Sequence, residues 1–190
     1  MSNIGDEIII GGIEYRCIIT EAQINEQIRL MAEKICQKHT GKDPPVVVCT
    51  AMGGLYLGVE LSKCLQDLNF DHEIDTLCVK KYAQDGKPGN TTLVNSLTID
   101  PCGRNLIIIE DIVDDGGTLN FLSSELERRY GSSLSIEWLA LIVKQGHKFK
   151  EEINYFAWTG DFGWLVGNGM DSRVSKYCLC RGLRNIYEKK

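Results

Sequence analysis

The hydrophobic pattern near the N-terminus predicts a hairpin followed by a helix. Two apolar runs flank Gly11-Gly12, a pair typical of a tight turn between two strands. Thr20 and Gln23 then form a capping box, and apolar residues at helical spacing follow as far as Ile35. The chain therefore begins with two short strands and changes to a helical period at Thr20.

Short apolar runs alternate with helical patterns over the rest of the chain. Strands are expected over residues 46–50, 72–82, 91–97, 106–109, 133–144, 153–158 and 164–169, and helices near residues 55–65 and 118–130. This order is typical of an α/β fold with a mainly parallel central sheet flanked by helices. Such sheets bind ligands beyond the carboxyl ends of their strands.

Length and composition fit a single domain over residues 1–190. Of the residues, 43% are hydrophobic and 25% are charged, as in an ordinary globular protein. The chain shows neither a signal peptide nor an apolar run of roughly 20 residues. The net charge of −5 argues against nonspecific nucleic-acid binding, and the eight cysteines show no CxxC spacing. We therefore expect a cytoplasmic protein with reduced thiols that binds neither membranes nor nucleic acid.

The stretch "IIIEDIVDDGGTL" concentrates negative charge at the end of an apolar run. Glu110 and Asp111 continue directly from the strand, and Asp114 and Asp115 follow within six positions. Carboxylates that are this close raise one another's pKa unless a cation or hydroxyl donors intervene. A magnesium ion or a sugar diol would relieve that repulsion.

The second half of the stretch suits a phosphate. Gly116 and Gly117 allow neighbouring N–H groups to converge, and a helix N-terminus adds partial positive charge. Thr118 can cap that helix or donate its hydroxyl. If Asp-Asp-Gly-Gly stood alone, a solvated turn would explain it. Carboxylates for a diol or metal beside amides for a phosphate instead indicate a site that binds a sugar phosphate. ATP hydrolysis is disfavoured because the stretch contains no GKS or GKT.

The same stretch resembles the signature of the type I phosphoribosyltransferases, which bind 5-phosphoribosyl-1-pyrophosphate (PRPP). The resemblance is closest to the 6-oxopurine branch, the hypoxanthine-guanine phosphoribosyltransferases. It implies that Glu110 and Asp111 lie beside the ribose hydroxyls and that residues 115–118 (Asp115, Gly116, Gly117 and Thr118) hold the 5′-phosphate. It also implies that Asp114 faces N7 of the base as the general base. A core over about residues 20–150 and a small hood from about 1–19 and 151–190 are implied as well.

The C-terminal half contains the expected base-binding residues. Lys144 ends an apolar run, where a lysine often extends toward solvent, but the resemblance implies a contact with O6 of the purine. The stretch "WLVGNGMD" also fits the family pattern, and the resemblance implies that Trp164 stacks on the purine. A plainer interpretation is that Trp164 is a core residue. Leu165 is expected to bind the base edge through its backbone, and Asp171 to bind a second magnesium. The expected metal-binding residues are therefore Glu110, Asp111 and Asp171.

Two segments depart from the usual family pattern. Met52, Gly53 and Gly54 occupy the place of the pyrophosphate loop, where the common pattern has Lys before the glycine and the family often has a non-proline cis peptide. Lys81 and Tyr82 precede residues 83–90, which match the long flexible loop of the family. In the family, the residues before that tyrosine are usually small residues that carry a hydroxyl group. We therefore expect Lys81, or its neighbour Lys80, to supply positive charge that Met52 does not.

We therefore interpret the chain as a purine salvage enzyme. It would transfer the phosphoribosyl group of PRPP to N9 of hypoxanthine or guanine, giving IMP or GMP plus pyrophosphate. Mg²⁺ is the implied cofactor, and a homodimer or homotetramer is the implied assembly. A xanthine-guanine enzyme and an adenine or pyrimidine enzyme are alternatives within the family. A regulatory homologue that binds nucleic acid is the alternative from another class, and Met52 is the main feature in its favour.

Overall fold

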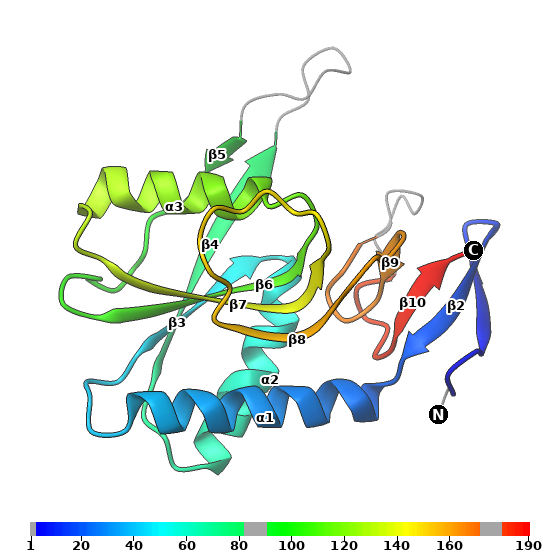
Figure 1. The fold of residues 1–190 in the computed structure, drawn as a ribbon, viewed down its shortest axis with the longest axis horizontal. Helices are drawn as coiled ribbons and strands as arrows, with labels where there is room; N and C mark the ends of the chain where they lie inside the picture. The colour runs from blue at the N-terminus through cyan, green and yellow to red at the C-terminus, as the bar shows by residue number, and fades with distance from the viewer. Residues whose placement is uncertain (1–2, 82–90, 172–179) are drawn as a thin grey trace.

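The computed structural model describes residues 3–81, 91–171 and 180–190. These residues form two sheets, a larger one flanked by helices and a smaller one beside it (Figure 1). The strand order is β5-β4-β3-β6-β7-β8 in the larger sheet and β1-β2-β10-β9 in the smaller sheet.

Parallel pairing dominates the larger sheet. Its parallel strands are β3 (Val46–Ala51), β4 (Glu73–Lys81), β6 (Asn105–Val113), β7 (Ser135–Lys144) and β8 (Tyr155–Gly160), and β5 (Thr91–Leu93) is antiparallel to β4. The central strands read as continuous apolar runs because both faces of the sheet are covered. The expected α/β fold with a mainly parallel sheet is confirmed.

Helices cover both faces of this sheet. Helices α1 (Glu21–His39) and α2 (Gly53–Asp67) pack with Ile107 and Ile109 of β6, whereas α3 (Gly117–Tyr130) packs with Leu106 and Ile108 on the opposite face. The expected capping box is present. The Thr20 hydroxyl accepts a hydrogen bond from the Gln23 N–H, and the Gln23 side-chain oxygen accepts one from the Thr20 N–H. No helix within the described parts of the chain is long and apolar enough to cross a membrane.

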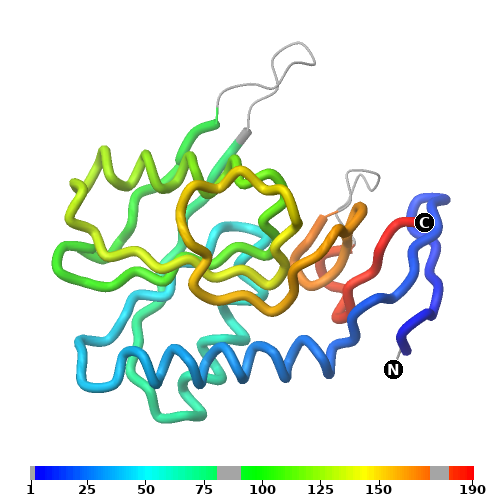
Figure 2. Tube along the Cα trace, in the orientation of Figure 1, coloured from blue at the N-terminus to red at the C-terminus, as the bar shows by residue number. Residues whose placement is uncertain are grey.

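The smaller sheet, which we call the hood, joins the two ends of the chain. Strands β1 (Glu7–Ile10), β2 (Ile13–Ile19), β10 (Ile186–Lys189) and β9 (Leu165–Val166) pair antiparallel around a separate apolar cluster. The first strand, β1, and the last strand, β10, both belong to this sheet and are drawn blue and red in Figure 2. Strand β10 was not expected, because four residues are too short to show an alternating pattern.

Two strands of the larger sheet differ from expectation. Residues 155–160 fall within the segment expected for the hood, but β8 pairs in parallel with β7, so the C-terminal part of the hood begins after Gly160. The strand expected over 91–97 stops at Leu93, because the Asn95 side chain takes over the pairing with β4. Its Oδ1 accepts from the Cys78 N–H at 2.7 Å, and its Nδ2 donates to the Thr76 carbonyl at 2.7 Å.

A charged cluster around Glu137 fastens the end of α1 to the sheet. The Glu137 carboxylate lies 3.1 Å from Lys38 Nζ and 3.3 Å from His39 Nε2, and it accepts from the Tyr155 hydroxyl at 2.5 Å. Glu137 is only 8% exposed. Burial raises its pKa, but the bonds from Tyr155, Lys38 and His39 together outweigh burial and leave the pKa below the usual value of 4.5.

We predict that Glu137→Gln destabilises the protein in a pH-dependent manner. Because folding lowers the pKa of Glu137, its stabilising effect is complete above the pKa of an unfolded glutamate and is lost as pH falls through the folded value. Urea unfolding should show a loss of roughly 1–2 kcal/mol at about pH 7 and a much smaller difference at about pH 3. Glu33→Gln, which removes an exposed partner of Arg29, is the control. An equal loss at both pH values would contradict the prediction.

Candidate active site

The turn between β6 and α3 lies at the carboxyl edge of the larger sheet. Gly116 is the N-cap of α3 with a φ of 81°, and a side chain there would also collide with the backbone nitrogen of Phe149. Thr118 does not cap the helix, contrary to one of its two expected roles. Asp115 Oδ1 instead accepts from the Gly117 N–H at 2.8 Å. This turn therefore presents backbone amides at a helix N-terminus, where an anion is favoured.

Strand β6 extends further than expected and contains two of the acidic residues. The sequence predicts a strand that ends at Ile109, but pairing with β7 continues to Val113, so Glu110 and Asp111 are strand residues. The extension follows from Ile112 and Val113, which pair with Ile142 and Val143 of β7. Asp114 is therefore the first acidic residue beyond the strand.

Asp114 and Lys144 meet at the ends of neighbouring strands. Lys144 is the last residue of β7, and its Nζ lies 2.9 Å from Asp114 Oδ1. The Lys144 side chain is 18% exposed and the Asp114 side chain is 64% exposed. A cationic donor and an anionic acceptor therefore stand side by side at the edge of the sheet. The structure thus brings together two residues that lie 30 positions apart in the sequence.

Asp111 is buried at the junction of β6 and α2. Burial raises its pKa, and the effects that favour the ionised form are its hydrogen bonds with Glu110 and with the Ile112 N–H, together with the positive charge of Arg181. Gly53 packs so closely on Asp111 that a β-carbon at position 53 would overlap the carboxylate. A cation beside Asp111 would lower its pKa by favouring the ionised form.

Asp171 pairs with an arginine that sequence reasoning missed. Arg181 donates from its guanidinium to Asp171 Oδ2 at 3.0 Å, and its charge also favours the ionised form of Asp111. Gly169 lies between these residues and α2: a β-carbon there would overlap the Gly53 carbonyl, and its N–H donates to the Arg181 carbonyl. No sequence motif identified Arg181, because only the tertiary fold brings it to Asp171.

Glu110, Asp111 and Asp171 are suitable donors for a magnesium ion. All three offer the hard oxygen atoms that Mg²⁺ prefers. Among the described residues, however, no group of three or more His, Cys, Asp and Glu is close enough to hold a metal ion by itself. Mg²⁺ commonly binds one or two carboxylates together with substrate phosphates. The donor set therefore fits a metal that is completed by a phosphorylated ligand.

The expected pyrophosphate loop leads from β3 into α2. The Ala51–Met52 peptide is cis, and Met52 is 52% exposed. Gly54 is needed for packing, because a β-carbon there would overlap the Ile109 carbonyl. Lys80 is exposed in β4, and Lys81 ends this strand. The Lys81 side chain, Tyr82 and the loop 83–90 lie outside the described parts of the chain.

The two expected base-binding residues of the hood have different environments. Leu165 is buried in β9, whereas Trp164 directly before it is 40% exposed. The Trp164 carbonyl accepts from the Lys189 N–H at 2.9 Å, which fixes its backbone to the C-terminal strand. This exposure does not fit the plainer interpretation of Trp164 as a core residue.

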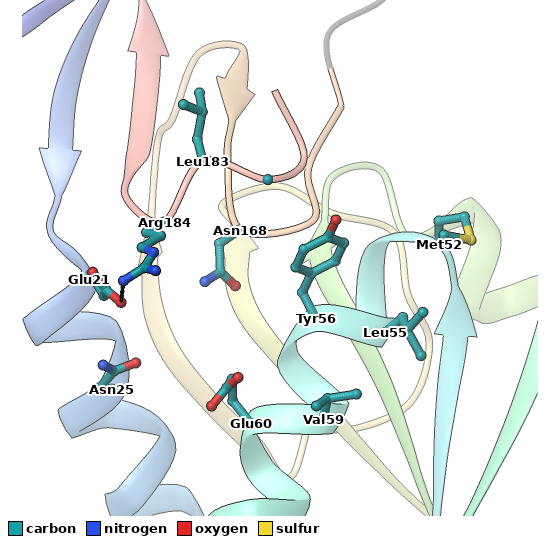
Figure 3. Close-up of a pocket in the computed structure, with 11 residues that line it drawn as sticks. Glu21, Asn25, Met52, Leu55, Tyr56, Val59, Glu60, Asn168, Leu183 and Arg184 are labelled. Carbon is teal, nitrogen blue, oxygen red and sulfur yellow. Dashed lines mark hydrogen bonds and ion pairs between the residues drawn. The ribbon is translucent and has the colours of Figure 1, made fainter. Parts of the chain in front are cut away.

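A separate groove of about 610 Å³ begins at Met52 and runs between α1, α2 and residues 182–184. Figure 3 shows Tyr56, Leu55 and Val59 along α2 on one side and the Glu21–Arg184 ion pair on the other. The residues that line this groove do not include Asp114 or Lys144. The groove therefore meets the candidate active site at Met52 of the expected pyrophosphate loop and otherwise lies beside it.

Known proteins share this architecture. Residues 19–173 match the family model of the phosphoribosyl transferase domain. The hypoxanthine-guanine-xanthine phosphoribosyltransferase of Tritrichomonas foetus is 26% identical over 156 residues, which cover 82% of this chain and 83% of that protein. The hypoxanthine phosphoribosyltransferase of Buchnera aphidicola is 25% identical over 157 residues, covering 82% and 87%.

Solved structures show the same fold. The hypoxanthine phosphoribosyltransferase of Trypanosoma cruzi in complex with the product IMP superposes with a TM-score of 0.80 at 22% identity, covering 100% of this chain and 97% of that chain. Because this family model spans residues 19–173, which are most of the sequence, the chain belongs to the phosphoribosyl transferase domain family.

Proposed function

We propose that the protein is a purine salvage enzyme that transfers the phosphoribosyl group of PRPP to N9 of hypoxanthine or guanine. The observation that carries the proposal is the Asp114–Lys144 pair, 2.9 Å apart and directly beside the amides of the β6–α3 turn. A 6-oxopurine presents O6 and N7 along one edge, so a lysine and a carboxylate can engage both atoms. The names of the relatives support the same substrate class.

In this proposal the residues of the chain divide between the two substrates. Residues 115–118, at the start of α3, bind the 5′-phosphate, and Glu110 and Asp111 face the ribose hydroxyls. Trp164 stacks on the base, and the Leu165 backbone binds its edge. Glu110 and Asp111 would hold one Mg²⁺ and Asp171 a second, and these ions would neutralise the pyrophosphate when bound.

The proposed reaction is a displacement at C1 of the ribose. The bond from N9 to C1 forms while the bond from C1 to the pyrophosphate oxygen breaks, and the electron pair leaves with pyrophosphate. Asp114 accepts the proton from N7 as N9 attacks, and Lys144 donates a hydrogen bond to O6. Position 52 offers no positive charge, and in this proposal Lys81 or Lys80 is the residue that compensates for it. Arg181, which pairs with Asp171, adds positive charge at this end of the site.

A nucleotide-formation assay tests the proposal. The purified protein is mixed with PRPP and Mg²⁺ and offered hypoxanthine, guanine and xanthine side by side. We expect IMP and GMP to form, and we expect EDTA to abolish the reaction until Mg²⁺ is restored. Preference for xanthine and guanine would favour the xanthine-guanine alternative. No turnover together with tight RNA or DNA binding would favour the regulatory alternative.

We predict that Asp114→Asn lowers turnover by about a hundred-fold or more, because asparagine cannot accept the N7 proton. Asp114 is largely exposed, so the melting temperature and the affinity for PRPP should stay close to those of the wild type. Asp43→Asn, which changes an exposed carboxylate before β3, serves as the control. Full activity of the Asp114→Asn enzyme would remove the role assigned to Asp114.

We also propose that the protein acts as a homo-oligomer in the cytosol. The groove along α2 exposes Met52, Tyr56 and Val59, and clustered apolar side chains of this kind mark interaction surfaces. A second copy seated on this groove would bury them.

Free thiols, including the exposed Cys102, support a reducing compartment. Recovery of the native protein with a membrane or extracellular fraction would contradict the cytosolic assignment.

We predict that Tyr56→Glu converts the oligomer to monomers by placing a charge in the buried contact. Light scattering after size-exclusion chromatography measures the mass of the wild type and the variant. Val94→Glu, at an exposed apolar residue that does not line the groove, should leave the mass unchanged. A monomeric wild type, or an unchanged mass for Tyr56→Glu, would rule out this groove as the contact.

A further inference from the structure

The segment between β7 and β8 supports the β6–α3 turn from outside. This segment, residues 145–150, begins directly after Lys144 and passes the N-terminus of α3 (Figure 1). Lys148 donates its N–H to the Asp115 carbonyl at 2.9 Å. The Phe149 backbone also fills the space in which a side chain at Gly116 would stand. The conformation of the turn thus depends on where this segment lies.

Phe149 anchors the segment to the core. Phe149 is 7% exposed, and its ring meets the ring of Trp138 edge to face, with a centroid distance of 5.0 Å. Apolar packing fixes the position of Phe149, but it leaves the backbone groups of Lys148 and Lys150 on either side to be held by hydrogen bonds.

Asn120 holds both of those flanking residues. Its Nδ2 donates to the Lys148 carbonyl at 2.9 Å, and its Oδ1 accepts from the Lys150 N–H at 3.3 Å. Its own N–H donates to the Gly116 carbonyl at 3.0 Å, as the first turn of α3. One residue therefore joins the helix, the supporting segment and the turn that presents the amides.

From this geometry we infer that Asn120 is a positioning residue for the 5′-phosphate of PRPP. The inference rests on the proposed function and adds a residue that does not itself touch substrate in that proposal. If Asn120 is shortened, Lys148 and Lys150 lose their side-chain partner, and the Lys148–Asp115 bond loses its support. The amides of residues 116–118 then no longer converge as well on a phosphate, while Lys144 keeps its place through the pairing of Lys144 with Gly160.

The inference predicts different effects on the two substrates. Asn120→Ala should raise KM for PRPP about ten-fold, whereas KM for hypoxanthine at saturating PRPP should change less than about two-fold. Asn120→Gln keeps both the amide donor and the acceptor and should recover much of the affinity for PRPP. A residue with a merely structural role would not separate the two KM values.

Ser123→Ala is the matched control. Ser123 lies three residues further along α3 and bonds Glu151, so its removal deletes a contact between the same helix and the same part of the chain but does not reach the turn. We expect its melting temperature to fall about as much as that of Asn120→Ala, with KM for PRPP unchanged. Equal KM values for PRPP in the wild type and Asn120→Ala would overturn the inference, as would an equal rise in Ser123→Ala.

Binding of ribose 5-phosphate, measured by calorimetry, separates this inference from the proposed function. Weaker binding by Asn120→Ala than by the wild type and Ser123→Ala supports the positioning role even without turnover. If the wild type transfers the phosphoribosyl group but the Asn120→Ala protein binds ribose 5-phosphate as tightly as the wild type does, the inference is overturned and the proposed function stands. A wild type that neither turns over nor binds ribose 5-phosphate overturns both.

Discussion

The parallel pairing of β6 with β3 and β7 is the constraint on which the rest of the site depends. Parallel strands end at the same edge of a sheet, so the turns after β3, β6 and β7 are brought together. The register places the end of β6 beside Lys144, and this produces the Asp114–Lys144 pair. A shift by one residue would turn the buried side chains of β6 to the opposite faces and separate that pair.

Glycines convert this arrangement into a closely packed site. Gly53 lies against Asp111, Gly169 lies against the Gly53 carbonyl, and Gly116 lies against Phe149. Each contact joins two elements that are distant in the sequence, including the hood and α2. Side chains at these positions would push the elements apart, so the glycines serve packing as well as any ligand. The close approach at Gly53 also explains how Asp111 comes to be buried, with a raised pKa.

Sequence reasoning was most successful where a local pattern has one structural outcome. The capping box at Thr20 and the apolar stripe of α1 were confirmed, as was the parallel sheet. Its errors occurred where partners distant in the chain decide the result. Strand β6 continues because β7 pairs with Ile112 and Val113, β8 joins the larger sheet, and Asn95 ends β5 early. Strand β10 was missed because it forms only against β2 and β9.

The sequence by itself determined the order of strands and helices, the acidic glycine-rich turn and the resemblance to phosphoribosyltransferases, because these depend on residue type and spacing along the chain. The tertiary structure alone decided that Asp114 meets Lys144, that Arg181 pairs with Asp171 and that Asn120 holds the segment beside the turn. These contacts join residues that lie from 10 to 30 positions apart in the chain. Local periodicity carries no information about such distances, which are set by sheet pairing and by close packing.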